Sequence, residues 1–197
     1  MIRRNLFRTA FVCGLVLLVA GCSKTDNSKA NFKAAINNYY AAHPACLWSQ
    51  TKKFPVQAAT ADESKTQGYD ALTDAGLLAR TTAEKKVFIL GSKQVNDYDL
   101  SDKGRGAWTQ DPTQPGYGNF CYGHRQVTSI DNFSTTVNTS GVKTAQVNYH
   151  FTMGDVAGWA QSQEMKTAFP ALNDTLGGSQ MGQATLVMNG NQWQMSQ

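Results

Sequence analysis

A strict alternation of apolar and polar residues near position 150 is the feature that most constrains the fold. Its apolar members are Ala145, Val147, Tyr149 and Phe151, and Gln146, Asn148 and His150 stand between them. Successive side chains of a β-strand point to opposite faces of the sheet. The pattern therefore predicts a strand with one buried face and one polar face.

Turn-forming residues predict that this strand belongs to an antiparallel sheet built from hairpins. The expected hairpins join 86–90 to 95–100 through 91–94, 120–137 to 145–151 through 138–141, and 184–188 to 191–195 through Asn189-Gly190. An Asn-Gly pair adopts positive φ angles readily, so we expect a type I′ turn in the last of these hairpins.

Helical spacing of apolar residues predicts helices on either side of these strands. The first begins after Asn27 or Ser28, presents Phe32 and Ile36 on one face, and ends near Ala42 before a proline. A second covers 65–78, and a third starts at a capping Asp155 and ends before Pro170. No βαβ unit repeats. The predicted class is α+β: an antiparallel sheet with an N-terminal helix and a helix packed on the second half.

The N-terminus carries the pattern of an export signal. Three arginines precede an apolar run over 10–20, and small Ala20 and Gly21 stand before Cys22. The segment resembles the lipobox of bacterial lipoprotein precursors. The resemblance implies that residues 1–21 are removed and that Cys22 is acylated. In such lipoproteins an Asp at the next position favours the inner membrane, so the resemblance implies that a chain with Ser23 there is in the outer membrane, with the domain facing the periplasm.

The resemblance divides the chain into three parts. After the signal, residues 22–29 are short and polar and are expected to form a flexible lipidated tether. Residues 30–197 are expected to form a single α+β domain. Prolines and glycines over 110–119 mark the place where two subdomains would divide.

Removal of the signal changes the charge balance. Three of the 18 basic residues lie in the signal, so the mature chain has 15 basic and 14 acidic residues. A chain so close to neutral has no general field that would attract nucleic acid, so nucleic-acid binding is not expected.

Two of the four cysteines remain in the folded domain. Cys13 leaves with the signal and Cys22 carries lipid, so Cys46 and Cys121 remain and are predicted to form a disulfide in an oxidising compartment. An alternative is a metal site, because His43 precedes Cys46 by three residues and His124 follows Cys121 by three. These four side chains would offer zinc a Cys2His2 set.

Other patterns indicate less. The acidic stretch from Asp97 lacks the glycine and the glutamate of a calcium loop. Residues 72–105 resemble the helix, wing and following turn of winged-helix proteins, but the helix before the wing is acidic rather than basic. Nucleophile motifs of the G-x-S-x-G and S-x-x-K types are absent from the sequence.

We therefore expect a membrane-anchored lipoprotein that faces the periplasm and binds an envelope protein, a peptide or a small ligand. No catalytic residue and no cofactor is expected. The competing hypothesis is an envelope hydrolase or a metal-binding protein that uses the cluster His43, Cys46, Cys121 and His124.

Overall fold

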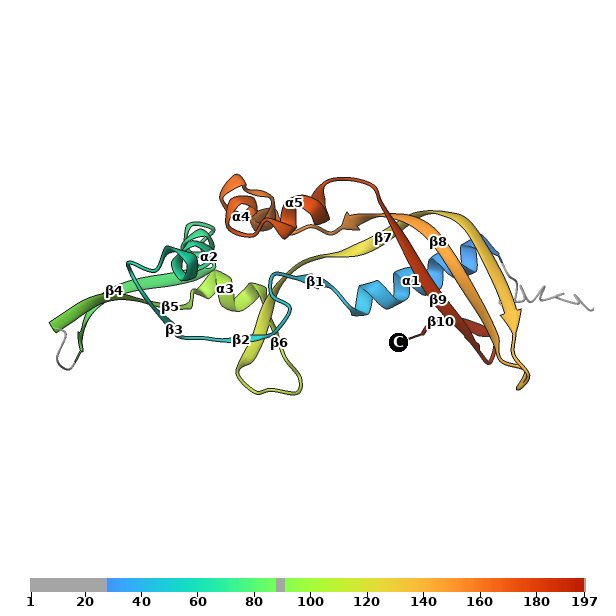
Figure 1. The fold of residues 1–197 in the computed structure, drawn as a ribbon, viewed down its shortest axis with the longest axis horizontal. Helices are drawn as coiled ribbons and strands as arrows, with labels where there is room; N and C mark the ends of the chain where they lie inside the picture. The colour runs from blue at the N-terminus through green and yellow to red at the C-terminus, as the bar shows by residue number, and fades with distance from the viewer. Residues whose placement is uncertain (1–27, 88–90, 197) are drawn as a thin grey trace, which may run out of the picture.

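Residues 28–87 and 91–196 are described by the computed structural model, and they form an elongated molecule (Figure 1). The expected signal peptide, the expected lipobox and most of the expected tether lie outside these residues. A long hairpin of β7 (Tyr117–Val137) and β8 (Lys143–Gly154) runs from the middle of the molecule to the end where α1 begins. The expected alternation is confirmed, since Ala145, Val147, Tyr149 and Phe151 of β8 are buried.

The larger sheet is antiparallel throughout. Its order is β1-β7-β8-β9-β10, and β2 and β6 pair with β7 outside this path. The remaining strands are β1 (Ala45–Cys46), β2 (Lys52–Lys53), β6 (Trp108–Gln110), β9 (Gln180–Asn189) and β10 (Gln192–Met195). The chain is thus a mixed α+β protein with antiparallel sheets, as the sequence predicts.

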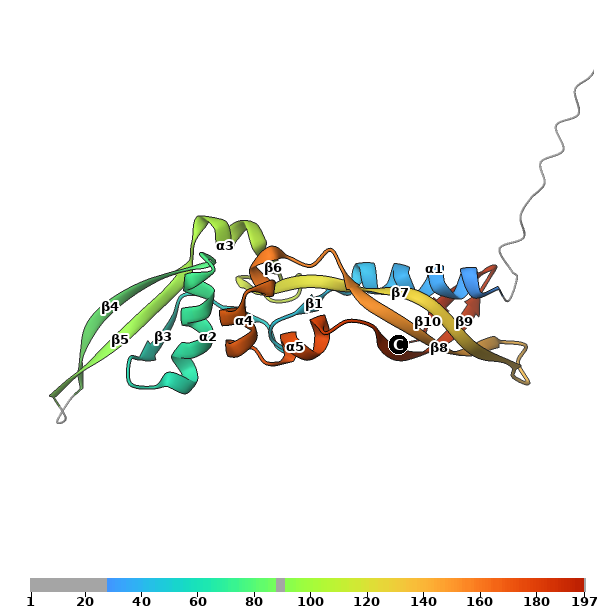
Figure 2. The ribbon, with the colours of Figure 1, turned by 90° about the horizontal axis from the view of Figure 1, so that it is seen from above.

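Helix α1 (Lys29–Ala42) packs against β7, β9 and β10 and closes the first hydrophobic core (Figures 1 and 2). The Ser28 hydroxyl caps its N-terminus by accepting a hydrogen bond from the Asn31 N–H. Phe32 and Ile36 are fully buried on its inner face. The Phe32 ring lies edge-on to Trp193, with 5.1 Å between the ring centroids.

A second core lies at the other end of the molecule. It is built on a three-stranded antiparallel sheet in the order β3-β5-β4, whose members are β3 (Val56–Ala59), β4 (Leu78–Val87) and β5 (Gly91–Leu100). The helices here are α2 (Glu63–Asp74), α3 (Asp102–Ala107), the 3-10 helix η1 (Gly158–Gln161), α4 (Gln163–Ala168) and α5 (Ala171–Leu176). Strand β7 contributes Phe120 to this core and Val127 to the first one, so it connects the two.

Two of the expected hairpins form with shifted turns. Residues 91–94, expected as a turn, belong to β5 and pair with β4, because backbone hydrogen bonds continue along polar residues as readily as along apolar ones. Residues 88–90 of the expected first strand lie outside the described residues. In the last hairpin Asn189 pairs with Gln192, so Gly190 and Asn191 form the turn. Gly190 has a φ of 57° and Asn191 is not at positive φ, which is the pattern of a type II′ turn rather than type I′.

The helix expected after Asp155 is broken into shorter pieces. Asp155 has a φ of 50°, which no residue within a right-handed helix adopts. Ser162 is extended, with a ψ of 153°, and its hydroxyl caps α4 by accepting from the Met165 N–H. A serine whose hydroxyl accepts a hydrogen bond from a free backbone N–H favours the start of a new helix over the continuation of the preceding one.

The region 72–105 does not form a winged helix within the described part of the chain. It contains the end of α2, the β4–β5 hairpin and α3, and β5 also pairs with β3 on its other side. The loop within 110–119 joins β6 to β7, two paired strands of one sheet.

Candidate functional site

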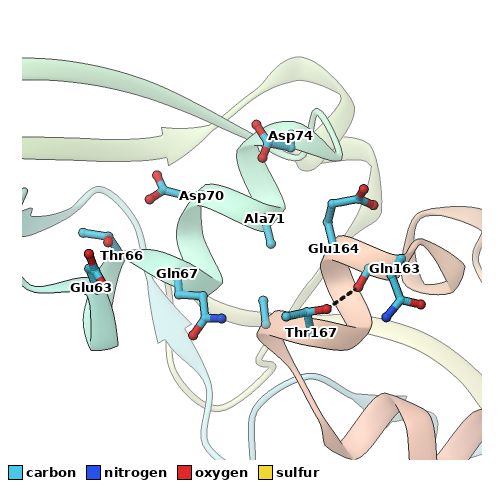
Figure 3. Close-up of a pocket in the computed structure, with 10 residues that line it drawn as sticks. Glu63, Thr66, Gln67, Asp70, Ala71, Asp74, Gln163, Glu164 and Thr167 are labelled. Carbon is cyan, nitrogen blue, oxygen red and sulfur yellow. Dashed lines mark hydrogen bonds between the residues drawn. The ribbon is translucent and has the colours of Figure 1, made fainter.

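A groove lies between α2 and α4 at the second core (Figure 3). Its volume is about 610 Å³. The α2 side consists of Glu63, Thr66, Gln67, Asp70, Ala71 and Asp74, and the α4 side of Gln163, Glu164, Thr167 and Ala168. These positions follow the three- and four-residue spacing of one helical face, so each wall is a single stripe of its helix.

Small residues allow the two helices to approach each other. Ala71 and Ala168 line the groove where larger side chains would fill it. A Cβ at Gly68 of α2 would lie 3.1 Å from the Phe169 ring, which follows α4 directly. The missing side chain at Gly68 therefore leaves room for Phe169 to pack against α2, and this contact holds the two walls of the groove together.

The groove walls are acidic. Glu63, Asp70, Asp74 and Glu164 line it, and no lysine, arginine or histidine is among the ten lining residues. Asp70 is neutralised, because Arg80 from β4 pairs with its Oδ1 at 2.6 Å. In the part of the chain that the structure describes, no hydrogen bond or ion pair engages the side chains of Glu63, Asp74 and Glu164. Three exposed carboxylates thus remain available along the groove.

A second hollow of about 630 Å³ continues the groove past α2. Ala71, Asp74 and Glu164 line both hollows, so these two carboxylates stand where the hollows meet. Beyond them the wall is formed by Trp159 of η1, half-buried, and by Lys103 of α3. The Lys103 ammonium donates a hydrogen bond to the Ala75 carbonyl oxygen at 2.8 Å. Trp159, Asp74 and Glu164 line this second hollow together with the Lys103 ammonium. Carboxylates and aromatic rings are groups that attract a cation.

Asp70 is held by a network that reaches into the sheet below α2. The buried Tyr98 hydroxyl donates to Asp70 at 2.8 Å and accepts from the side-chain amide of buried Asn96 at 3.1 Å. Burial raises the pKa of Tyr98 above its usual range, and the nearby Asp70 carboxylate raises it further. This phenol therefore stays protonated and acts as a fixed donor that orients Asp70.

The predicted disulfide is present. Cys46 of β1 and Cys121 of β7 are bonded, and the two residues face each other directly in the strand pairing. Both sulfurs are thereby removed as thiolates, so the alternative zinc set of His43, Cys46, Cys121 and His124 has lost two of its four ligands. Among residues 28–87 and 91–196, no group of three or more histidine, cysteine or acidic side chains is arranged to hold a metal ion.

The three histidines occupy separate places. His43 stacks on Tyr39 at the end of α1, and its Nδ1 lies 2.7 Å from the Tyr39 carbonyl oxygen. The His124 ring is 3.6 Å from an oxygen of Asp155, and the His150 ring is 2.8 Å from Asp131. None of the three lines the acidic groove.

The acidic groove was not anticipated from the sequence. A signal for part of one wall exists, since Asp70 and Asp74 share a face of the second helix expected over 65–78. Glu63 precedes that expected range and joins the wall because α2 begins earlier, at Glu63. The opposite wall comes from a helix nearly one hundred positions later in the chain, so its pairing with α2 depends on tertiary contacts.

Comparison of the whole chain with protein-family models, with curated proteins and with solved structures finds no match. Within the described residues, no helix is both long and apolar enough to cross a membrane.

Proposed function

We propose that this protein is a non-enzymatic binding lipoprotein of the bacterial envelope. It is anchored by acylated Cys22, faces the periplasm, and uses the groove between α2 and α4 to bind a ligand with several positive charges. The outer membrane is the favoured location, because Ser23 follows the acylated cysteine.

The observation that carries the binding function is the set of unpaired carboxylates along a continuous hollow. Asp74 and Glu164 stand at its middle, Glu63 at one end and Trp159 at the other. Carboxylates placed along a channel bind successive cationic groups of an extended ligand, and an indole face adds a cation–π contact. A short basic peptide has this chemistry.

The disulfide supports the proposed compartment. Structural disulfides form and persist in oxidising places such as the periplasm and are rare in the cytosol. The disulfide between Cys46 and Cys121 also removes the thiolates on which the competing hydrolase or metal-binding hypothesis depends.

Ligand binding is tested by titrating the protein with tetralysine and following tryptophan fluorescence and heat. We expect saturable binding that weakens with added salt, because exposed charge pairs are screened. Each exposed ion pair contributes up to about 1 kcal/mol, so Asp74→Asn and Glu164→Gln are each expected to weaken binding by up to roughly fivefold. Asp174→Asn is the matched control, since this exposed carboxylate on α5 lies outside the groove.

Tetraglutamate supplies the second control and is expected not to bind. Equal effects of the Asp74, Glu164 and Asp174 substitutions would show that tetralysine is attracted by overall charge rather than by the groove, and would contradict the proposal.

The anchor is tested by membrane fractionation. Wild-type protein is expected in the outer-membrane fraction, and Cys22→Ala is expected to stay unprocessed or to leave that fraction. A Cys22→Ala variant that fractionates like the parent would contradict lipid anchoring.

A further inference from the structure

The nearly neutral balance of the mature chain conceals a difference between the two ends of the molecule. We define the anchor lobe as residues 28–44, 123–152 and 180–196, which surround α1 and the first core. Its charged residues are four basic ones, Lys29, Lys33, Arg125 and Lys143, and one acidic one, Asp131. Positions 45–122 and 153–179 hold ten basic and twelve acidic residues. We call positions 45–122 and 153–179 the far lobe. The net charge of the anchor lobe is therefore positive and that of the far lobe is negative.

Exposed apolar side chains gather at the tip of the anchor lobe. Val137 is 64% exposed and Val142 is 39% exposed, and they flank the turn that joins β7 to β8. Phe133, 36% exposed, precedes them on β7. Of the large apolar side chains that are exposed within the described residues, only Met181 lies elsewhere.

This tip lies at the end of the molecule where α1 begins (Figures 1 and 2). The Phe133 ring contacts Phe32 in the first turn of α1, with 4.8 Å between the ring centroids. The Lys29 and Lys33 ammonium groups donate hydrogen bonds to the backbone oxygens of Asp131 and Thr128 on β7. The start of α1 and the outer part of the long hairpin are therefore fixed to each other.

The length of the tether limits where this end can be. Cys22 and Ser28 are six positions apart in the chain. Each step extends the chain by at most about 3.6 Å, so Cys22 and the start of α1 are at most roughly 22 Å apart. Strand β7 has 21 residues, and a rise of about 3.3 Å per residue makes it roughly 70 Å long. The tether thus brings the anchor lobe to the membrane and cannot by itself bring the far lobe there.

We propose that the tip of the anchor lobe contacts the anionic lipid surface that holds the anchor, so that the molecule stands end-on with its acidic groove directed away from the membrane. This inference rests on the proposed lipid anchoring of Cys22. Val137 and Val142 meet the boundary between headgroups and acyl chains, while Lys29, Lys33 and Lys143 face anionic headgroups. The negative far lobe is repelled by the same surface.

The contact is tested with the mature lipidated protein in vesicles that contain phosphatidylglycerol and lipids brominated in their acyl chains. Val137→Trp places a reporter at the tip, and Lys86→Trp places the same residue on the exposed β4–β5 hairpin at the opposite end. We expect the emission added at position 137 to shift to the blue and to be quenched by bromine. The emission added at position 86 should stay unquenched.

Charge and anchoring are separated in the same preparation. Because a lysine near an anionic surface has an attraction equivalent to roughly fivefold in affinity, Lys143→Gln should weaken the contact of the Val137→Trp reporter by about that factor. Lys93→Gln, in the far lobe, should leave it unchanged. Flotation of the protein with the vesicles reports the lipid anchor independently of any reporter.

Protein that floats with the vesicles while its position-137 reporter is unquenched would overturn the end-on contact and leave the anchor intact. Equal quenching at positions 137 and 86 would also overturn it, in favour of a molecule lying flat. Failure of the protein to float would overturn the anchor and, with it, this inference.

Discussion

The disulfide between Cys46 and Cys121 gives a stability prediction whose magnitude follows from the chain. It joins residues 75 positions apart. In the chain-entropy treatment, closing a loop of this length lowers the entropy of the unfolded state by an amount equivalent to about 4.5 kcal/mol at 25 °C. For a domain of this size, each kcal/mol shifts the melting temperature by about 2–4 °C. We therefore expect the double variant Cys46→Ser/Cys121→Ser to melt roughly 9–18 °C below the parent.

The position of the disulfide explains why its loss should destabilise both hydrophobic cores. Cys121 lies on β7 next to Phe120 of the second core, and Cys46 follows the end of α1, which covers the first core. Strand β1 has only two residues, so few backbone hydrogen bonds hold it to β7 without the disulfide.

Differential scanning calorimetry and circular dichroism, each with and without reductant, provide the measurement. Reductant should lower the melting temperature of the parent to that of the double variant and should not affect the variant itself. A shift of less than about 3 °C in the double variant would refute the reasoning, because it would show that the unfolded chain gains little freedom when the loop is opened.

Three further predictions concern individual contacts. Tyr98→Phe leaves the buried amide of Asn96 without its acceptor, and denaturant unfolding should show a loss of about 1–3 kcal/mol. Hydrogen bonds from the Thr113 side chain and backbone hold the pKa of Asp111 below its usual range. Such a carboxylate stabilises the fold above its unfolded-state pKa, so Asp111→Asn should cost stability at pH 7, and the difference from the parent should vanish as the pH falls through the lowered pKa of Asp111. A methyl group on Gly104 would clash with the backbone oxygen of Leu77, whereas a methyl group on Gly106 would have no other atom within 4 Å. In thermal melts Gly104→Ala should therefore cost roughly 3 kcal/mol, and Gly106→Ala should cost nothing.

The strand pattern was the most predictable part of the fold. The alternation around Tyr149 reports burial directly, because a strand has only two faces and the core takes one of them. The turn at 138–141 was equally predictable, because asparagine and glycine favour turns. In the structure the Asn138 side chain accepts hydrogen bonds from two backbone N–H groups, and Gly141 has a φ of 79°. The exact pairing was less predictable. The turn of the last hairpin is formed by Gly190 and Asn191. Strand β9 pairs with β8 as well as with β10, so the register of the hairpin depends on contacts beyond its own two strands.

The region after Asp155 shows where local patterns fail. Its apolar residues approach helical spacing, and the single helix expected before Pro170 is replaced by η1 and α4, with the short helix α5 after Pro170. Met165 and Leu172 are both buried in the second core although they lie on different short helices. Packing against that core compensates for the broken backbone hydrogen bonds, and no local propensity records such compensation.

The sequence by itself determined the mixed class with antiparallel pairing and the two cysteines that pair in the domain. The proposed export signal also rests on the sequence alone. These properties depend on residue type and on spacing over a few positions. Only the tertiary structure decided that α2 and α4 form one acidic groove and that basic residues gather around the start of α1. Both arrangements join side chains that are far apart in sequence, and the packing that brings them together is a property of the whole fold.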